Sequence, residues 1–198
     1  MIILCLGLIL FFVPHLSQDL GIRQRIINAL PSQAAYMGLY SLVSLSGIAL
    51  IVWGKSIAEF TMVWQPIFEL RMVSHVLMIP AAVLVVAGNL PMSNLRKYLR
   101  NPMLLGVTFW GLAHLWSNGD LASIILFLSF TLWAGFKFLR LGVQAKAGDQ
   151  GTTQQVKNIW ELLKWDTISL ICGLSFYVVI SLFHGQLFGV GLDFVQTY

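Results

Sequence analysis

The chain has 198 residues, of which 58% are hydrophobic and 10% charged, and its mean hydropathy is +0.80. Soluble domains carry about a quarter charged residues, so a chain this apolar lacks the polar surface that a soluble globule needs. The net charge of +4 does not indicate nucleic-acid binding, because the basic residues are not gathered in one stripe. The composition therefore predicts an integral membrane protein.

Six apolar segments approach the roughly 20 residues that a helix needs to cross a bilayer. In chain order they are Met1–Ser17, Tyr36–Gly54, Met72–Leu90, Met103–Ser117, Leu121–Leu139 and Thr167–Phe188. They predict an all-α transmembrane helical bundle of about six spans, in a single domain over residues 1–198. Five spans would result if the fourth and fifth segments formed one re-entrant hairpin.

The connections between these segments are polar and mostly short. Gln18–Gln33 is amphipathic and is expected at the membrane interface. Gly142–Gln155 is predicted to be a flexible linker, and Val156–Trp165 a surface helix. Asp120 and Asp166 precede the fifth and sixth segments, where each is expected to cap a helix.

The basic residues predict the orientation. With alternating connections, ten Lys and Arg residues fall on one side, and only Lys55 and Arg71 fall on the other. Because basic residues are enriched in cytoplasmic loops, the first side is expected to be cytoplasmic and both termini non-cytoplasmic. In a bacterium this membrane would be the inner membrane.

The fourth segment carries the most informative pattern. Pro102 suits the first turn of a helix, and Asn118-Gly119 is a strong stop signal. Between them Gly106, Trp110 and His114 share a helix face. This face would suit a flat apolar ligand that needs a nitrogen donor.

Each of the four histidines, His15, His75, His114 and His184, lies in or at the end of an apolar span. Ionisable residues in a membrane usually face the bundle interior, and imidazole is a common axial ligand of haem iron. The alternative is that each is neutral and structural. At ~1.5 Å per residue, His15 and His114 reach similar depths within a small boundary error, whereas His75 and His184 approach the outer surface.

Several other chemistries have no support in the sequence. No Ser/His/Asp set, Walker loop, dinucleotide fingerprint or Cys-rich metal motif is present. Cys5 and Cys172 lie inside apolar runs and are not expected to form a disulfide.

Several motifs together resemble one family. They are Arg100-Asn-Pro-Met-Leu-Leu-Gly106, Trp110-Gly-Leu-Ala-His-Leu-Trp-Ser-Asn-Gly-Asp120, Gly38-Leu-Tyr-Ser-Leu-Val-Ser-Leu-Ser-Gly47, Val52-Trp-Gly54 and His184-Gly185. They resemble the NnrU family of bacterial membrane proteins, which is associated with nitrite and nitric oxide reduction. That family is similar to zeta-carotene isomerase, a membrane enzyme that uses haem b.

The resemblance implies haem b, with His15 and His114 as the axial ligands of the iron. Gly106 and Trp110 would shape the pocket, while His75 and His184 rank below as ligands. Asn101 stands where both families usually have a histidine, and Gly111 stands where the plant isomerase has a cysteine implicated in ligand exchange. That redox exchange is therefore not expected here.

The resemblance and these patterns together imply three possible functions. The first is a haem b membrane protein that supports denitrification, by electron transfer to a nitrogen-oxide reductase or by maturation of one, with membrane lipid around it. The second is a haem-dependent cis–trans isomerase acting on an apolar polyene such as a carotenoid. The third, a membrane methyltransferase, ranks low because Asp193 is the only acidic residue near the C-terminal end.

Overall fold

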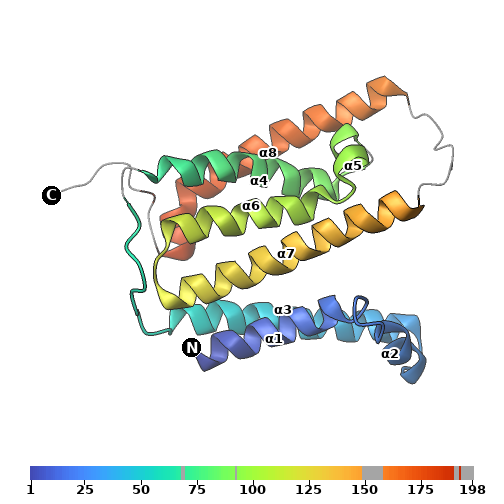
Figure 1. Cartoon of the computed structure of the whole chain (residues 1–198), viewed down its shortest axis with the longest axis horizontal. Coiled ribbons are helices and arrows are strands. Elements are labelled where there is room, and N and C mark those ends of the chain that lie inside the picture. Colours follow the sequence, from blue (N-terminus) through green and yellow to red (C-terminus); the bar gives the residue numbers. More distant parts are fainter. Residues whose placement is uncertain (68–69, 92, 149–157, 190–191, 193–198) are drawn as a thin grey trace. The chain divides into compact units, whose positions relative to one another are not determined.

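A computed structural model describes residues 1–67, 70–91, 93–148, 158–189 and 192. Within these ranges the chain is helical, and the only β pairing is an isolated bridge between Met62 and Asp120. The helices are α1 (Ile2–Leu16), α2 (Arg23–Ala29), α3 (Gln33–Ser56), α4 (Met72–Asn89), α5 (Asn94–Leu99), α6 (Pro102–Ser117), α7 (Leu121–Gly148) and α8 (Ile159–Phe188) (Figure 1). The predicted all-α class is confirmed.

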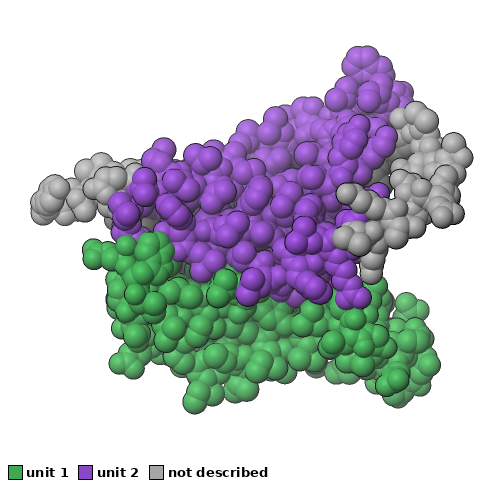
Figure 2. Space-filling model, in the orientation of Figure 1, with its two compact units in different colours: residues 1–65, 118–129 green, residues 66–117, 130–198 purple. Residues whose placement is uncertain are grey.

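The chain divides into two compact units (Figure 2). Unit 1 contains residues 1–65 and 118–129, and unit 2 contains residues 66–117 and 130–198. Helix α7 contributes its first residues to unit 1 and the rest to unit 2.

Unit 1 is built on the antiparallel pair α1 and α3, which lie side by side (Figure 1). The contact is close because glycines face it: a Cβ on Gly7 would lie 2.6 Å from the Ile51 amide nitrogen, and one on Gly47 would lie 2.7 Å from that of Phe11. Small residues bring membrane helices together in this way. Ser32 begins α3 by accepting a hydrogen bond from the Ala35 amide.

Unit 1 also joins two distant loops. The Val63 amide donates to the Gly119 carbonyl at 2.8 Å, and the Leu121 amide donates to the Thr61 carbonyl at 2.9 Å. The segment after α3 is therefore bonded to the turn between α6 and α7.

In unit 2, α4 packs against both α6 and α8. Here too glycines make the contacts: a Cβ on Gly106 of α6 would lie 2.8 Å from the Ala81 carbonyl oxygen, and one on Gly173 of α8 would lie 2.5 Å from the Val83 Cα. One stripe of α8 is buried or half-buried, formed by Leu162, Asp166, Ser169, Gly173, Tyr177, Ile180 and His184. The outward residues of α8 are largely apolar, as expected for a helix in lipid.

Four described helices are long and apolar enough to cross a membrane: Gln33–Ser56, Met72–Asn89, Leu121–Gly142 and Ile159–Phe188. They lie in four of the six predicted segments. The other two segments form α1, with 15 residues, and α6, with 16 residues. Helices of this length span about 22 to 24 Å, less than the ~30 Å hydrocarbon core. The six-span count, the sides of the termini and the single domain over 1–198 stay predictions.

One prediction about the C-terminal half was wrong, and another was wrong for the part that the structure describes. Asp166 does not cap a helix of its own, because α8 runs without interruption from Ile159. Its carboxylate instead accepts hydrogen bonds from the Asn94 and Leu95 amides at 3.2 and 3.0 Å, and so caps α5. The predicted linker Gly142–Gln155 begins as helix, since α7 continues to Gly148, and residues 149–157 lie outside the described part.

Candidate functional site

His114 lies one turn before the end of α6, in unit 2. Helix α6 begins at Pro102, as predicted, and ends at Ser117 before the Asn-Gly-Asp turn. The His114 Nδ1 atom lies 2.8 Å from the Trp110 carbonyl oxygen. A carbonyl only accepts, so Nδ1 carries the proton, and in the neutral ring Nε2 carries the lone pair.

Trp110 and Gly106 occupy the same face as His114 but have different neighbours. The Trp110 ring lies 5.1 Å from the His114 ring and meets the Phe130 ring edge to face at 5.7 Å. Gly106 lies where the backbones of α6 and α4 come together. This close contact alone explains why the residue at that position is a glycine. Trp110 therefore contacts the imidazole, whereas Gly106 allows α6 to approach α4.

His184 lies beside His114. Their ring centroids are 6.5 Å apart and their planes are inclined by 27°. His184 is on α8, one turn before its end, and its ring also contacts the Phe188 ring at 4.9 Å. The sequence placed His184 near the outer surface and did not pair it with His114.

His75 has a different partner. Its Nδ1 atom lies 2.7 Å from the Tyr177 hydroxyl of α8. Tyr177 and His184 are seven residues apart, which places them on one face of α8. This spacing is the feature of the sequence that could have indicated that Tyr177 lies among the histidines. The structure therefore pairs His75 with Tyr177 and His114 with His184.

These two pairs lie at one end of unit 2, where α4 begins and α6 and α8 end. A serine links the first two helices there: Ser74 Oγ donates to the Ala113 carbonyl at 3.0 Å and bonds the Ser117 hydroxyl. The Trp116 indole donates to the Leu70 carbonyl at 3.0 Å. Three of the four histidines are therefore gathered where these helix ends are tied together.

His15, the fourth histidine, belongs to unit 1. Its Nδ1 atom lies 2.6 Å from the Phe11 carbonyl, one turn back on α1. Its ring stacks on Phe11 with centroids 4.3 Å apart and lies 5.1 Å from the Tyr40 ring. His15 thus has the same Nδ1 bond to the preceding turn as His114, and the same tautomer.

The residues suit haem iron better than a bare metal ion. Among the residues that the structure describes, no three His, Cys, Asp or Glu side chains are placed to hold an ion together. Haem iron takes four nitrogens from its porphyrin and asks the protein for only one or two axial donors. Metal-bound histidines almost always donate the other ring N–H, often to a backbone carbonyl, as His15 and His114 do.

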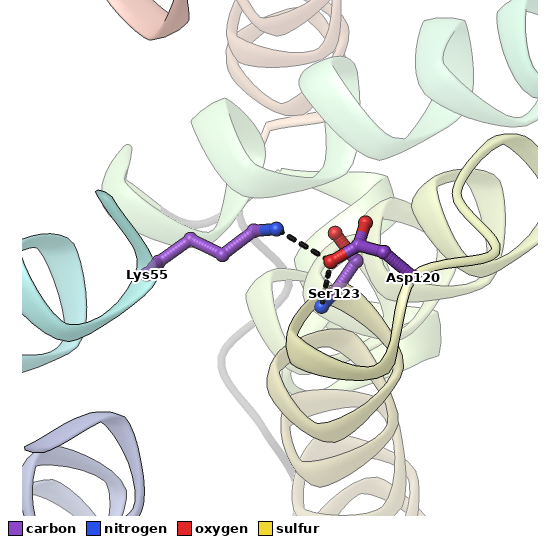
Figure 3. Close-up of polar contacts among 3 residues, drawn as sticks. All are labelled: Lys55, Asp120 and Ser123. Carbon is purple, nitrogen blue, oxygen red and sulfur yellow. Dashed lines mark hydrogen bonds and ion pairs between the residues drawn. The ribbon is translucent and has the colours of Figure 1, made fainter. Parts of the chain in front are cut away.

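A second polar site, not predicted from the sequence, lies in unit 1 (Figure 3). Lys55 Nζ is 2.8 Å from Asp120 Oδ2, which also accepts the Ser123 amide at 3.0 Å. Burial raises the pKa of the Asp120 carboxyl. The hydrogen bonds from Lys55 and Ser123 and the charge of Lys55 outweigh this effect, and the pKa lies below its ordinary value. Asp120 caps α7, as predicted, and also binds the end of α3.

Apolar helices of membrane-spanning length, with histidines in and between them, define a helical membrane protein. The family model described as NnrU protein matches residues 3–192, nearly the whole chain. The chain therefore belongs to the NnrU family. No curated protein and no solved structure matches it.

Proposed function

We propose that this NnrU-family protein binds haem b in the bacterial inner membrane and supports nitrogen-oxide respiration there. Its role would be to pass electrons to a nitrogen-oxide reductase or to assist the maturation of one. Family membership supports an NnrU-type membrane protein. The association of that family with nitrite and nitric oxide reduction suggests the denitrification role. Asp193, the residue weighed for a methyltransferase, lies outside the described part, and no observation favours that function or the isomerase.

One observation carries the haem proposal. His15 and His114, the two proposed ligands, both donate Nδ1–H to the carbonyl one turn back, at 2.6 and 2.8 Å. This bond fixes the ring orientation and leaves Nε2 as the basic nitrogen, the form in which imidazole binds a metal. When bound, haem b supplies one-electron redox chemistry.

The chain's own residues would orient and shield such a group. The Trp110 and Phe11 carbonyls hold the two imidazoles in one tautomer, and the Trp110 and Phe130 rings add apolar surface beside His114. Apolar side chains around a bound haem would strengthen the bonds from the imidazole nitrogens to the iron and would keep water away from it.

The test is a pyridine haemochrome assay for haem in the purified protein, followed by the absorption spectrum of the native protein compared with those of His15→Ala, His114→Ala and His75→Ala. Loss of even an outer partner of a metal-bound histidine costs about 10- to 100-fold in affinity, so His114→Ala should lower haem affinity at least tenfold. His15→Ala should shift the Soret and alpha bands. His75→Ala is the matched control and should leave them unchanged, because His75 ranks below His15 and His114 as a ligand and pairs with Tyr177 of α8.

Two results would overturn this proposal. A wild-type protein that takes up no haem under reconstituting conditions removes its chemical basis. Identical spectra for the wild type, His15→Ala and His114→Ala remove the ligand assignment.

A further inference from the structure

Helix α5 lies at the end of unit 2 opposite the three histidines, where α4 ends and α6 and α8 begin, and it contacts all three of these helices. Figure 1 shows α5 running across the direction of the longer helices. Its 6 residues span about 9 Å, far less than the ~30 Å hydrocarbon core of a bilayer. A short helix that lies across the ends of spanning helices is expected at the level of the lipid headgroups.

Polar contacts hold one side of α5 against the rest of unit 2. The Asp166 carboxylate of α8 accepts the Leu95 amide at 3.0 Å. The Ser93 hydroxyl accepts the Arg96 amide at 3.2 Å, and the Arg96 guanidinium donates to the Leu90 carbonyl. Asp166 and Arg96 are therefore engaged inside the unit, and they fix the position of α5.

The other side of α5 presents two cations and an aromatic ring to the surroundings. Tyr98 is 76% exposed, and Lys97 Nζ lies 5.9 Å from the centre of its ring. Lys97 and Arg100 are also exposed. Within the part of the chain that the structure describes, neither forms an ion pair, whereas Lys55 of unit 1 is paired with Asp120. The outward side of α5 thus carries two positive charges that no described acidic side chain neutralises.

The backbone at Arg100 is strained. Its φ is 60° and its ψ is −46°, and the Asn101 amide donates to the Leu99 carbonyl at 2.6 Å across it. This is a γ-turn with a positive φ, a rare conformation that glycine adopts more easily than a residue with a side chain. The turn itself therefore does not call for an arginine, and the charge of the side chain is the property left to explain.

We propose that Lys97, Tyr98 and Arg100 bind the headgroup phosphate of an anionic phospholipid. The two cations are complementary in charge to the phosphate, and the guanidinium presents several N–H donors that match its oxygens. The Tyr98 ring suits the boundary between headgroups and acyl chains, where tyrosine and tryptophan are enriched. Trp160, in the first turn of α8 at the same end of the unit, is 74% exposed and indicates the same level. The site contains none of the proposed haem ligands, so the inference is independent of the proposed function.

The test is the retention of lipid by the full chain in mixed micelles with equal amounts of phosphatidylglycerol and phosphatidylcholine, measured by native mass spectrometry. The wild type should retain phosphatidylglycerol in preference. From the usual contribution of a basic residue near an anionic surface, Lys97→Gln/Arg100→Gln should lower the apparent affinity for phosphatidylglycerol about 30-fold. Arg23→Gln/Arg25→Gln is the matched control, because it removes the same charge from α2, and it should leave this affinity nearly unchanged.

A further variant separates loss of the site from loss of the fold. Arg100→Gly removes the cation and also relieves the strained φ. Its unfolding midpoint in detergent should therefore stay the same or rise, while its affinity for phosphatidylglycerol falls about fivefold. Lys97→Arg keeps the charge and should keep the affinity.

Four results would overturn the proposal. A wild type without a preference for phosphatidylglycerol removes its basis. Equal losses in the two double variants would mean that total charge, and not this site, holds the lipid. An unchanged affinity in Arg100→Gly would remove the cation at the turn from the site. Displacement of phosphatidylglycerol by soluble glycerol phosphate would show that the site binds free phosphate.

Discussion

Asp120 shows how one side chain at the end of a helix can fasten several parts of a unit. Its carboxylate caps α7 through the Ser123 amide and pairs with Lys55 at the end of α3. The Asp120 side chain is only 10% exposed, whereas that of Lys55 is 34% exposed. The pair is therefore partly shielded from water. Its contribution to the free energy of unfolding is expected to lie between that of an exposed ion pair and that of a buried one.

Replacement of Asp120 should destabilise unit 1 in two steps. Asp120→Asn keeps an oxygen that can cap α7 but loses the charge, and it should cost up to about 1 kcal/mol. Asp120→Ala removes the cap as well and should cost about 1 kcal/mol more. Unfolding in mixed detergent micelles measures both, and equal losses for the two variants would show that the cap contributes nothing.

The same carboxyl predicts a pH dependence. Its pKa is lower in the folded protein than the ordinary value of about 3.9, so the unfolded chain binds the proton more readily. The stabilisation is therefore fully present above the ordinary pKa and is lost as the pH falls through the folded-state pKa. The wild type should lose its stability advantage over Asp120→Asn below about pH 4. An advantage that stays constant down to pH 2 would contradict this.

At the scale of helices, glycines decide which surfaces meet. Gly7 and Gly47 bring α1 and α3 together, while Gly106 and Gly173 place α6 and α8 on α4. Gly47 and Ser44 are both buried on α3. The sequence analysis assigned Gly106 to a ligand pocket, whereas its contact with α4 was visible only in three dimensions.

Two glycines of α3 offer a matched pair of substitutions. Gly47→Ala should destabilise the protein by about 1–3 kcal/mol, because its Cβ would meet the backbone of α1. Gly38→Ala should be neutral or stabilising by up to about 1 kcal/mol, because nothing lies within 4 Å of the new atom. Unfolding midpoints in detergent measure the difference, and equal midpoints would rule out close packing at Gly47.

The helices were largely predictable from sequence, because apolar runs and Pro or Gly boundaries act locally. Pro102 and Asn118-Gly119 gave the limits of α6 closely. Contacts between distant residues were not predictable in this way. Lys55 with Asp120, Asn94 with Asp166, and His114 with His184 depend on how helices pack, which no local pattern contains.

For the whole molecule, the pairing of two loops bears on the number of spans. The Leu121 amide donates a hydrogen bond to the Thr61 carbonyl, and the Val63 amide donates one to the Gly119 carbonyl. Alternating spans place the connection between α3 and α4 and the turn between α6 and α7 on the same side of the membrane. A re-entrant hairpin of the fourth and fifth segments would bury that turn in the bilayer instead.

The six-span orientation can be tested with single cysteines in a chain lacking Cys5 and Cys172. Thr61→Cys and Asn118→Cys should both react with a membrane-impermeant maleimide in intact cells. Lys97→Cys, on the basic side, should react only after permeabilisation, because basic connections stay in the cytoplasm. Labelling of Thr61→Cys without Asn118→Cys would favour the hairpin, and labelling of Lys97→Cys alone in intact cells would reverse the orientation. Thr61→Cys and Asn118→Cys should be labelled to the same extent, because the loops that contain them are hydrogen-bonded to each other in unit 1.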